Sequence, residues 1–206
     1  MSKPYKAQDK YFRKAKTHGK RARSYFKIEE VDQKLQLLRP GHHILDLGAA
    51  PGSFLQYAME KIGGTGFAVG IDLTPIQSLG GKEQILTYEG DIYEESTKEW
   101  LKNAHPKLFH GVISDLAPKT TGIKDVDHWN SVELSREVLR YARAFIRPGG
   151  YCVIKIFHGQ EFDGFVRSMK KTFKTVKIEK PDASRDRSKE VYLIGIGRED
   201  VNPVVK

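Results

Sequence analysis

The sequence predicts an α/β fold in which a mostly parallel sheet has helices on both faces. Short apolar segments alternate along the chain with segments whose apolar residues recur at helical spacing. The first apolar segment, residues 44–47, ends at a glycine-rich turn from Gly48 to Gly52, and a helical pattern follows directly. Acidic residues stand at or near the ends of several apolar segments. Strand, glycine turn and helix in this order form the nucleotide-binding opening of a doubly wound sheet.

The pattern predicts seven strands and five helices. We expect strands over residues 44–47, 66–72, 84–88, 112–115, 151–157, 173–178 and 191–196. We expect helices over residues 24–38, 53–62, 94–103, 129–146 and 160–172, with Ser24 and Ser53 as N-caps. Residues 119–127 and 181–189 are expected to be loops. An edge hairpin would make the last strand antiparallel.

Length and composition indicate a globular protein of a reducing compartment. The 206 residues are enough for a full core, and the single cysteine, Cys152, excludes an internal disulfide framework. No apolar run approaches the ~20 residues of a membrane span, so we expect a cytoplasmic protein without membrane association. No apolar segment follows the basic N-terminus, which argues against a secretory signal, whereas a mitochondrial presequence stays open because residues 1–27 are poor in acid.

The N-terminal segment carries the excess charge. Residues 1–27 hold ten Lys or Arg and one acid, so they account for the net charge of +9. Aromatic residues are interleaved with this charge: Tyr5, Tyr11, Phe12, Tyr25 and Phe26. Positive charge can hold phosphates, and aromatic rings can stack on bases. We therefore expect residues 1–23 to be a basic RNA-binding arm and residues 24–206 to be one folded domain; the alternative for the arm is a solvated tail.

The glycine turn favours an adenosine ligand without phosphates. Its spacing is Gly48-x-x-x-Gly52, which differs from the G-x-G-x-x-G of dinucleotide enzymes, so a dehydrogenase is disfavoured. Asp72 lies 24 residues beyond Gly48, close to where an acid meets the ribose hydroxyls in this fold. The structural alternatives are an ordinary strand-to-helix turn and a capping role for Asp72.

Charged residues gather where ligands bind in open α/β sheets, beyond the carboxyl ends of the strands. Five of them lie at or near such ends: Asp46, Asp72, Asp91, Asp115 and Lys155. Glu190 directly precedes the last strand, so an antiparallel strand would bring Asp115, Lys155 and Glu190 together. A buried lysine such as Lys155 is costly unless it is paired, which indicates either a carboxylate partner or a catalytic role. A partly desolvated lysine beside another cation has a lowered pKa and can act as a general base.

Five stretches of the chain together form a specific pattern: residues 24–27 (SYFK), 46–52 (DLGAAPG), 114–118 (SDLAP), 153–157 (VIKIF) and 185–192 (RDRSKEVY). With these stretches, in this order, the chain resembles the RrmJ/FtsJ-type RNA ribose 2′-O-methyltransferases over nearly its whole length. The resemblance implies a Rossmann-like S-adenosylmethionine-dependent methyltransferase fold, with residues 24–206 as the catalytic domain. Ser53 and Phe54 stand where many members have Gly-Trp, and Phe54 keeps an aromatic ring there.

The resemblance also implies the site residues. The catalytic Lys-Asp-Lys-Glu tetrad of the family falls on Lys27, Asp115, Lys155 and Glu190. Lys155 would accept the proton of the hydroxyl, Asp115 and Glu190 would orient Lys155, and Lys27 would assist and hold the substrate. The S-adenosyl-L-methionine pocket of the family falls on Gly48, Ala49, Pro51, Gly52, Ser53, Phe54, Asp72, Leu73, Asp91, Ile92 and Asp115.

The resemblance leaves the RNA substrate open. The compact length is most similar to the bacterial members that act on a uridine of large-subunit (23S) ribosomal RNA, and we expect such an enzyme to be a monomer. Alternatives are a 2′-O-methyltransferase of tRNA or another RNA, and a non-catalytic RNA-binding ribosome-assembly factor. A base N-methyltransferase is disfavoured, because it would usually carry an Asn/Asp-Pro-Pro-aromatic segment at Asp115 to Pro118 and would not need Lys155. No metal site is expected, because the histidines and the cysteine show no ligand spacing.

Overall fold

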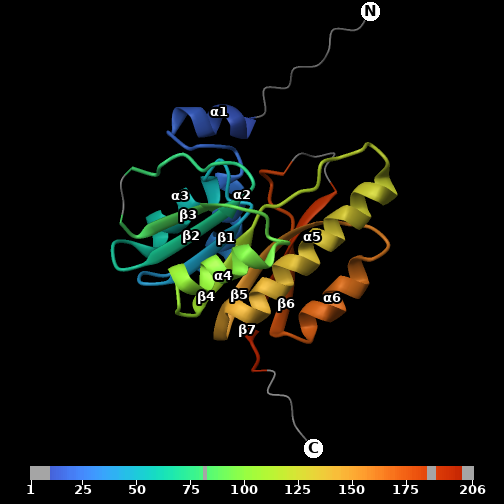
Figure 1. The fold of residues 1–206 in the computed structure, drawn as a ribbon. Helices are drawn as coiled ribbons and strands as arrows, with labels where there is room; N and C mark the ends of the chain where they lie inside the picture. The colour runs from blue at the N-terminus through green and yellow to red at the C-terminus, as the bar shows by residue number, and fades with distance from the viewer. Residues whose placement is uncertain (1–9, 81–82, 185–188, 201–206) are drawn as a thin grey trace, which may run out of the picture.

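The computed structural model describes residues 10–80, 83–184 and 189–200. Its sheet has seven strands in the order β3-β2-β1-β4-β5-β7-β6 (Figure 1). The strands are β1 (His43–Leu47), β2 (Phe67–Asp72), β3 (Ile85–Glu89), β4 (Phe109–Ser114), β5 (Ile146–Phe157), β6 (Phe173–Glu179) and β7 (Glu190–Arg198). The helices are α1 (Lys10–Thr17), α2 (Tyr25–Leu35), α3 (Ser53–Ile62), α4 (Glu95–Ala104), α5 (Lys124–Phe145) and α6 (Phe162–Lys170).

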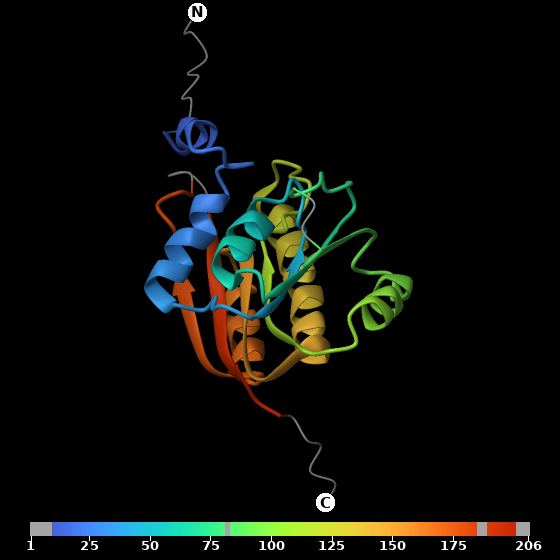
Figure 2. The same cartoon turned by 90° about the vertical axis from the view of Figure 1, so that its left-hand side faces the viewer.

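The sheet is parallel from β3 to β5, and β7 runs antiparallel to both of its neighbours. The predicted mostly parallel sheet with an antiparallel last strand is therefore confirmed. Helices α2 and α3 cover one face, and α4, α5 and α6 cover the other (Figures 1 and 2). The strand order reverses between β1 and β4, and ligands of open α/β sheets bind at such a switch point.

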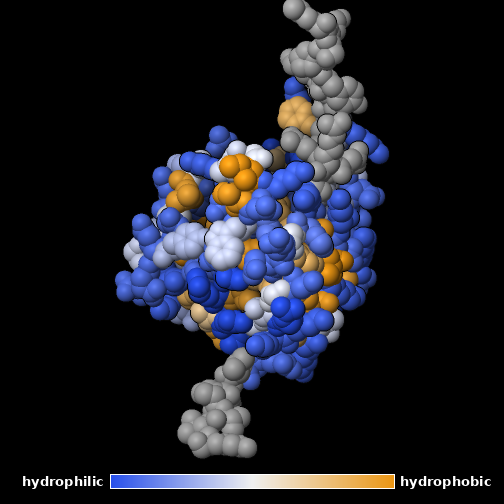
Figure 3. Space-filling model, turned by 90° about the vertical axis from the view of Figure 1, so that its right-hand side faces the viewer, coloured by the Kyte–Doolittle hydropathy of each residue, from blue (hydrophilic) through white to orange (hydrophobic). Residues whose placement is uncertain are grey.

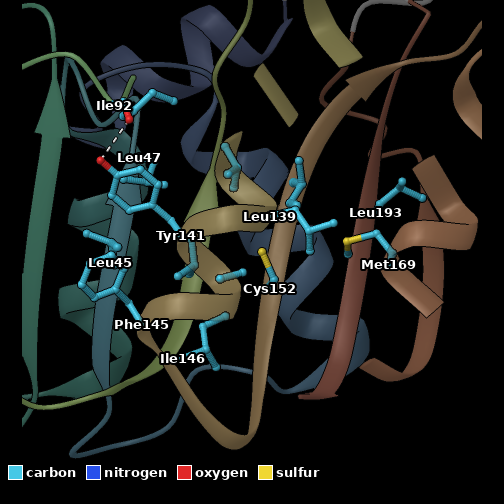
Figure 4. Packing of buried hydrophobic residues seen from close by; sticks show 14 of the residues in the cluster. Leu45, Leu47, Ile92, Leu139, Tyr141, Phe145, Ile146, Cys152, Met169 and Leu193 are labelled. Atoms are coloured by element: carbon cyan, nitrogen blue, oxygen red, sulfur yellow. Dashed lines mark hydrogen bonds between the residues drawn. The ribbon is translucent and has the colours of Figure 1, made fainter. Parts of the chain in front are cut away.

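Residues alternate between the two faces along each strand, as strand geometry requires. In β1, Leu45 and Leu47 belong to the apolar cluster under α5 and α6, while Ile44 belongs to the cluster under α2 and α3. Figure 4 shows the first of these clusters, in which the Tyr141 hydroxyl donates a hydrogen bond of 3.1 Å to the main-chain oxygen of Ile92. Both faces of the sheet are thus buried, which agrees with the continuous apolar character of its central strands.

Helix α2 ends earlier than the predicted residue 38. Its last residue is Leu35, and Gln36 follows in the left-handed conformation with a φ of 50°. Asp32 supplies the reason, because its Oδ1 accepts the backbone N–H groups of Leu37 and Leu38 at 2.8 Å each. The side chain thereby replaces two helical hydrogen bonds, a local competition that short acidic residues offer.

Neither predicted serine N-cap forms. Ser24 makes no capping hydrogen bond, and its hydroxyl lies 2.7 Å from the hydroxyl of Ser53. Gly52, with a φ of 100°, occupies the N-cap position of α3, and Ser53 is the first residue of that helix. The two hydroxyls therefore connect the starts of α2 and α3 to each other.

Two helical segments were not predicted. Helix α5 begins at Lys124, inside the segment predicted to be a loop, and Asp127 in its first turn accepts the N–H groups of Thr121 at 2.6 Å and Gly122 at 3.2 Å. These bonds draw the preceding residues onto the start of the helix. Helix α1 lies in the basic arm, where the sequence predicted no element. Its Ala15 side chain is buried.

The surface is mostly hydrophilic on the face shown in Figure 3, with apolar side chains in separate patches. Exposed large apolar side chains include Ile123, Val126 and Trp129 around the start of α5. Within the described ranges, none of the helices combines the length and the apolar character that a membrane span needs.

Candidate active site

Four charged side chains and one tyrosine meet at the carboxyl edge of the sheet. This charged cluster consists of Lys27 of α2, Asp115 directly after β4, Lys155 near the end of β5, and Glu190 and Tyr192 at the start of β7. The strand register explains the meeting. Ser114 pairs with Ile154, so Asp115 and Lys155 follow at neighbouring positions. Lys155 in turn pairs with Tyr192 across the antiparallel ladder.

Asp115 is the centre of the charged cluster. Its Oδ1 lies 3.0 Å from the Lys155 Nζ and 3.5 Å from the Lys27 Nζ. The Tyr192 hydroxyl donates to the same oxygen at 2.5 Å. The Lys155 Nζ also donates to the main-chain oxygen of Asp115. Asp115 therefore fixes the Lys155 ammonium through two of its oxygens.

Glu190 completes the charged cluster from the other side. Its Oε1 lies 2.8 Å from the Lys27 Nζ, so Lys27 bridges the two carboxylates. The side chains of Lys27 and Lys155 are 5% and 7% exposed, and that of Glu190 is 10% exposed. Burial of this extent requires pairing of each charge, and the alternating arrangement of cations and carboxylates supplies it.

The electrostatic environment keeps the two carboxylates ionised. Burial by itself raises the pKa of Asp115, but Lys155 and Lys27, helped by the Tyr192 hydroxyl, lower that pKa below its ordinary value. Burial likewise acts against ionisation of Glu190, and Lys27 outweighs it, so the pKa of Glu190 is also lowered. Burial, together with the charge of Asp115, raises the pKa of Tyr192 well above its ordinary value. The Tyr192 hydroxyl therefore retains the proton that it donates to Asp115.

Asp46 differs from the other acids of this edge. It is fully buried in β1, and burial raises its pKa well above the ordinary value. The neighbouring charges of Asp115 and Asp72 raise the pKa of Asp46 further. The environment therefore shifts the pKa values of Asp46 and Asp115 in opposite directions.

The glycine turn is held by the end of β2. The N–H groups of Gly48 and Ala49 donate to the main-chain oxygen of Ile71 at 2.8 and 3.2 Å. The N–H of Ala50 donates to the carboxylate of Asp72 at 3.0 Å. Gly48 has a φ of +77°, and a Cβ atom there would lie 2.4 Å from the Leu116 side chain. Only glycine fits this close approach of the two strand ends.

A cavity lies beside this turn, next to the charged cluster. Its lining includes Gly48, Asp72, Leu73, Asp91 and Ile92, all of which the sequence predicted for the cofactor, and also Ile71, Gly90, Tyr93, Leu116 and Leu134. The other predicted cofactor residues, Ala49, Pro51, Gly52, Ser53, Phe54 and Asp115, do not line it. Phe54 is buried within α3, with its ring 6.3 Å from that of Tyr192.

Two residues of this region escaped the sequence analysis. Tyr192 was given no role, although it stands two residues after Glu190 in a strand and thus on the same face. In the sequence, Arg21 is one of the ten basic residues of the N-terminal segment. Its guanidinium donates to the main-chain oxygens of Pro51 and Gln77 at 2.7 Å each and to that of Ser78 at 2.5 Å. No local pattern identifies Arg21, because its acceptors are backbone groups of distant segments.

Most of the chain matches one protein family. Residues 20–198 match the family described as FtsJ-like methyltransferase. The chain belongs to this family. A ribosomal RNA large subunit methyltransferase E from an Anaeromyxobacter species is 44% identical over 197 residues, which are 96% of this chain and 71% of that protein. The protein of the same name from Syntrophobacter fumaroxidans is 41% identical over 192 residues, 93% of this chain and 96% of that protein.

Solved structures agree with this assignment. A ribosomal RNA methyltransferase from Plasmodium falciparum superposes with a TM-score of 0.76 at 26% identity, covering 86% of this chain and 98% of that one. Fibrillarin from Aeropyrum pernix superposes with a TM-score of 0.59 at 19% identity, over 78% of this chain and 68% of that one, which concerns the fold alone. The predicted Rossmann-like methyltransferase fold and the resemblance to this family are thus confirmed. The part of this FtsJ-like methyltransferase that matches the family includes the whole charged cluster and leaves out α1.

Proposed function

We propose that this FtsJ-like methyltransferase transfers the methyl group of S-adenosyl-L-methionine to the 2′-hydroxyl of a uridine in large-subunit (23S) ribosomal RNA. The observation that carries the proposal is the pairing of buried Lys155 with Asp115 beside the cavity at the switch point of the sheet. A base N-methyltransferase would not need such a lysine. The relatives named ribosomal RNA large subunit methyltransferase E support the choice of RNA.

The cavity fits the adenosine part of the cofactor. Leu73, Ile92 and Tyr93 supply apolar and aromatic surface for a base, and Asp72 lies where a ribose is bound in this fold. Asp72 uses its carboxylate to hold the glycine turn, and each of its oxygens has a second lone pair for a ribose hydroxyl. Gly48 and Leu116 both line the cavity, and a side chain at Gly48 would collide with that of Leu116. When bound, the cofactor supplies a methyl group made electrophilic by the positively charged sulfur.

The charged cluster positions and deprotonates the nucleophile. Lys155 acts in its neutral amine form, after release of one proton to solvent. The ribose hydroxyl gives its proton to this Lys155 Nζ as its oxygen forms the new bond to the methyl carbon, and the bond from that carbon to sulfur breaks. Asp115 and Tyr192 hold Lys155 in place, and Lys27 together with Glu190 holds Asp115 and the substrate. Positioning of two reactants can supply roughly 7–11 kcal/mol of barrier reduction, and the proton transfer a further factor of about 10²–10⁴ in rate.

The basic arm is proposed to bind the RNA backbone. In α1, Lys10, Arg13 and Lys16 are exposed to solvent. The segment after α1 is anchored beside the glycine turn by Arg21 and by an ion pair of 2.9 Å between Lys20 and Glu60. This anchoring supports a path for RNA from the arm to the charged cluster. Residues 1–9 of the predicted arm, and residues 185–188 of the last family stretch, lie outside the described residues.

We expect the protein to act as a monomer in the cytoplasm, because every proposed catalytic group comes from one chain and the proposed substrate is ribosomal.

A methyl-transfer assay on large ribosomal subunits that lack the modification tests the proposal. The RNA is digested to nucleosides and analysed by mass spectrometry. We expect a 2′-O-methyluridine signal that disappears with Lys155→Ala. Transfer to tRNA or capped RNA, with none to ribosomal subunits, would keep the chemistry and overturn the substrate. Tight RNA binding without transfer to any RNA would favour the non-catalytic assembly factor.

A further inference from the structure

The end of β5 extends beyond its parallel partner. Strand β4 pairs with β5 as far as Ser114 and Ile154, and then leaves the sheet at Asp115. On that edge of β5, no strand among the described residues pairs with the backbone groups of Lys155 and Phe157. Buried backbone groups must find other partners, and here the partners determine where Lys155 lies.

Helix α5 supplies these partners from three side chains on one face. The Ser135 hydroxyl shares its proton between the main-chain oxygen of Lys155 at 3.2 Å and that of Ser131, one turn earlier in the helix, at 2.7 Å. The Ser131 hydroxyl accepts the N–H of Phe157 at 3.0 Å. The His128 Nδ1 donates to the main-chain oxygen of Phe157 at 2.9 Å. Their spacing of three and four residues aligns the side chains along the helix. We call His128, Ser131 and Ser135 the α5 polar row.

His128 also holds the segment that follows β5. Its Nε2 accepts the N–H of Glu161 at 3.0 Å, so the ring is neutral with its proton on Nδ1. A Cβ atom at Gly159 would lie 2.5 Å from the His128 ring, so glycine is required where this segment passes the ring. On the other side of the same segment, the N–H of His158 donates to the main-chain oxygen of Lys189 at 2.9 Å, directly before Glu190.

The α5 polar row lies where apolar residues would serve the packing of the core. His128, Ser131 and Ser135 are 7%, 3% and 1% exposed. All of their backbone partners on β5 belong to Lys155 or to Phe157, two residues further along. Alternate residues of a strand point to the same face, so fixing these two residues fixes the direction of the Lys155 side chain toward Asp115.

We propose that His128, Ser131 and Ser135 are positioning residues for the methyl-transfer reaction, which hold the unpaired end of β5 so that the Lys155 Nζ meets Asp115. The inference rests on the proposed role of Lys155. Side chains of helix α5 thus bind the backbone groups that a further strand would otherwise pair with. They also connect the backbone at Lys155, the proposed general base, to the loop before Glu190.

Ser131→Ala, Ser135→Ala and the double variant test this inference. We measure kcat at saturating RNA and cofactor, the dissociation constants of both ligands, and amide hydrogen exchange at Phe157. A misplacement of a reacting group by 1 Å can cost about 10²-fold in rate. We expect the double variant to lose roughly 10-fold or more in kcat, with faster exchange at Phe157 and both dissociation constants within about twofold of wild type. Ser168→Ala is the control, because the Ser168 hydroxyl donates within α6, to the main-chain oxygen of Gly164 at 3.2 Å, and makes no contact with β5 among the described residues.

Two results would overturn the inference. One is an unchanged kcat although exchange at Phe157 has become faster. The hydrogen bond from the Phe157 N–H to the Ser131 hydroxyl would then be lost without any effect on the rate of methyl transfer. The other is a parallel loss of kcat and of both binding affinities, which indicates a general structural role. If the double variant does not fold, the two single variants decide by the same measurements. Failure of the proposed function is distinguishable, since Lys155→Ala would then retain transfer whatever the serine variants do.

Discussion

The two edges of the sheet bury ionisable groups in opposite ways. At the carboxyl edge, the charged cluster joins cations to carboxylates, and each charge has an opposite charge within 3.5 Å. At the amino edge, around the starts of β1 and β4, four histidines contact one another. This histidine cluster consists of His42, His43, His105 and His110.

Neutral rings satisfy the hydrogen bonds of the histidine cluster. The His105 Nδ1 donates to the main-chain oxygen of Lys107 at 2.8 Å, and its Nε2 lies 2.8 Å from the His43 Nδ1, which donates to it. The His110 Nδ1 accepts the N–H of His43 at 2.9 Å. The rings of His42 and His110 stack with centroids 4.4 Å apart. A proton added at an accepting nitrogen would break one of these bonds.

The comparison shows that burial alone does not decide the charge of a group. Burial lowers the pKa of His110 to about 4, and the nearby charge of Arg147 acts in the same direction. Burial opposes ionisation of Asp115 as well, but there Lys155 and Lys27 reverse the outcome and lower the pKa. One edge therefore keeps charges available for chemistry, and the other keeps its groups neutral within the packing.

Replacing one residue at each edge should separate activity from stability. We expect Lys155→Ala to reduce methyl transfer by about 10²–10⁴-fold, with the cofactor dissociation constant nearly unchanged. We expect His105→Ala to leave kcat nearly unchanged but to lower the free energy of unfolding by roughly 1–3 kcal/mol, because buried partners lose their hydrogen bonds. Isothermal titration, single-turnover kinetics and urea unfolding measure these effects. Equal losses of transfer and cofactor binding in Lys155→Ala would refute the role of Lys155.

The sequence predicts the charged edge better than the histidine edge. Asp115 directly follows one apolar segment and Lys155 lies near the end of another. Parallel strand ends share an edge, so their meeting follows from topology. His42 and His43 show no such signal, because their partners approach through the docking of a helix and a second strand. Tertiary contacts of this kind have no local pattern in sequence.

The same reasoning explains which parts of the fold were predicted. The central strands could be located because each is a continuous apolar run, and glycine or proline stands between the runs. Helix starts were predicted less well. Ser24 met the hydroxyl of Ser53 rather than a backbone N–H, and Asp127 organised a segment whose polar composition resembles a loop. The start of a helix therefore depends on whether a polar side chain bonds to a local or to a distant partner.

Removing charge from α1 should weaken RNA binding at the charged edge. We expect the triple variant Lys10→Gln, Arg13→Gln, Lys16→Gln to lose about 10-fold or more in RNA affinity at low salt, and the slope of log affinity against log salt to decrease by roughly 0.7–0.9 for each phosphate that the variant no longer neutralises. The matched control is Lys170→Gln, Lys171→Gln, Lys174→Gln, which removes the same charge from exposed residues at the end of α6 and in β6. Equal effects of the two triple variants would mean that the arm has no special role.

Tyr192→Phe should move the acidic limit of activity. The Tyr192 hydroxyl is one of the groups that lower the pKa of Asp115, so its removal raises that pKa. Activity needs ionised Asp115, and kcat should therefore begin to fall at a higher pH than in wild type, with a loss of about 10-fold at neutral pH from poorer placement of Lys155. Tyr151→Phe removes a buried hydroxyl from the same sheet outside the charged cluster and is the control. A kcat profile of Tyr192→Phe that coincides with that of Tyr151→Phe would contradict this role.

The smallest expected effect concerns the pH dependence of stability. Groups at the two edges of the sheet change their contribution to stability in different pH ranges. The pKa of His110 is about 4 in the folded protein and has an ordinary value of 6.5, so between these values the unfolded chain binds more protons. The stability from neutral His110 is therefore complete above pH 6.5 and is lost as the pH falls toward 4. The carboxylates Asp115 and Glu190, whose pKa values are lowered, lose their contribution only at still lower pH.

His110→Asn tests this separation, because the Asn oxygen can still accept the N–H of His43 while the titrating ring is absent. We expect the variant to lose less stability than wild type between pH 6.5 and 4, by about 1 kcal/mol after allowance for solvent screening. His158→Asn, at an exposed histidine outside the histidine cluster, is the control. Urea unfolding at several pH values measures the difference. If His110→Asn loses as much stability as His158→Asn in this window, the amino edge does not respond to protonation, and its contrast with the charged edge is one of geometry alone.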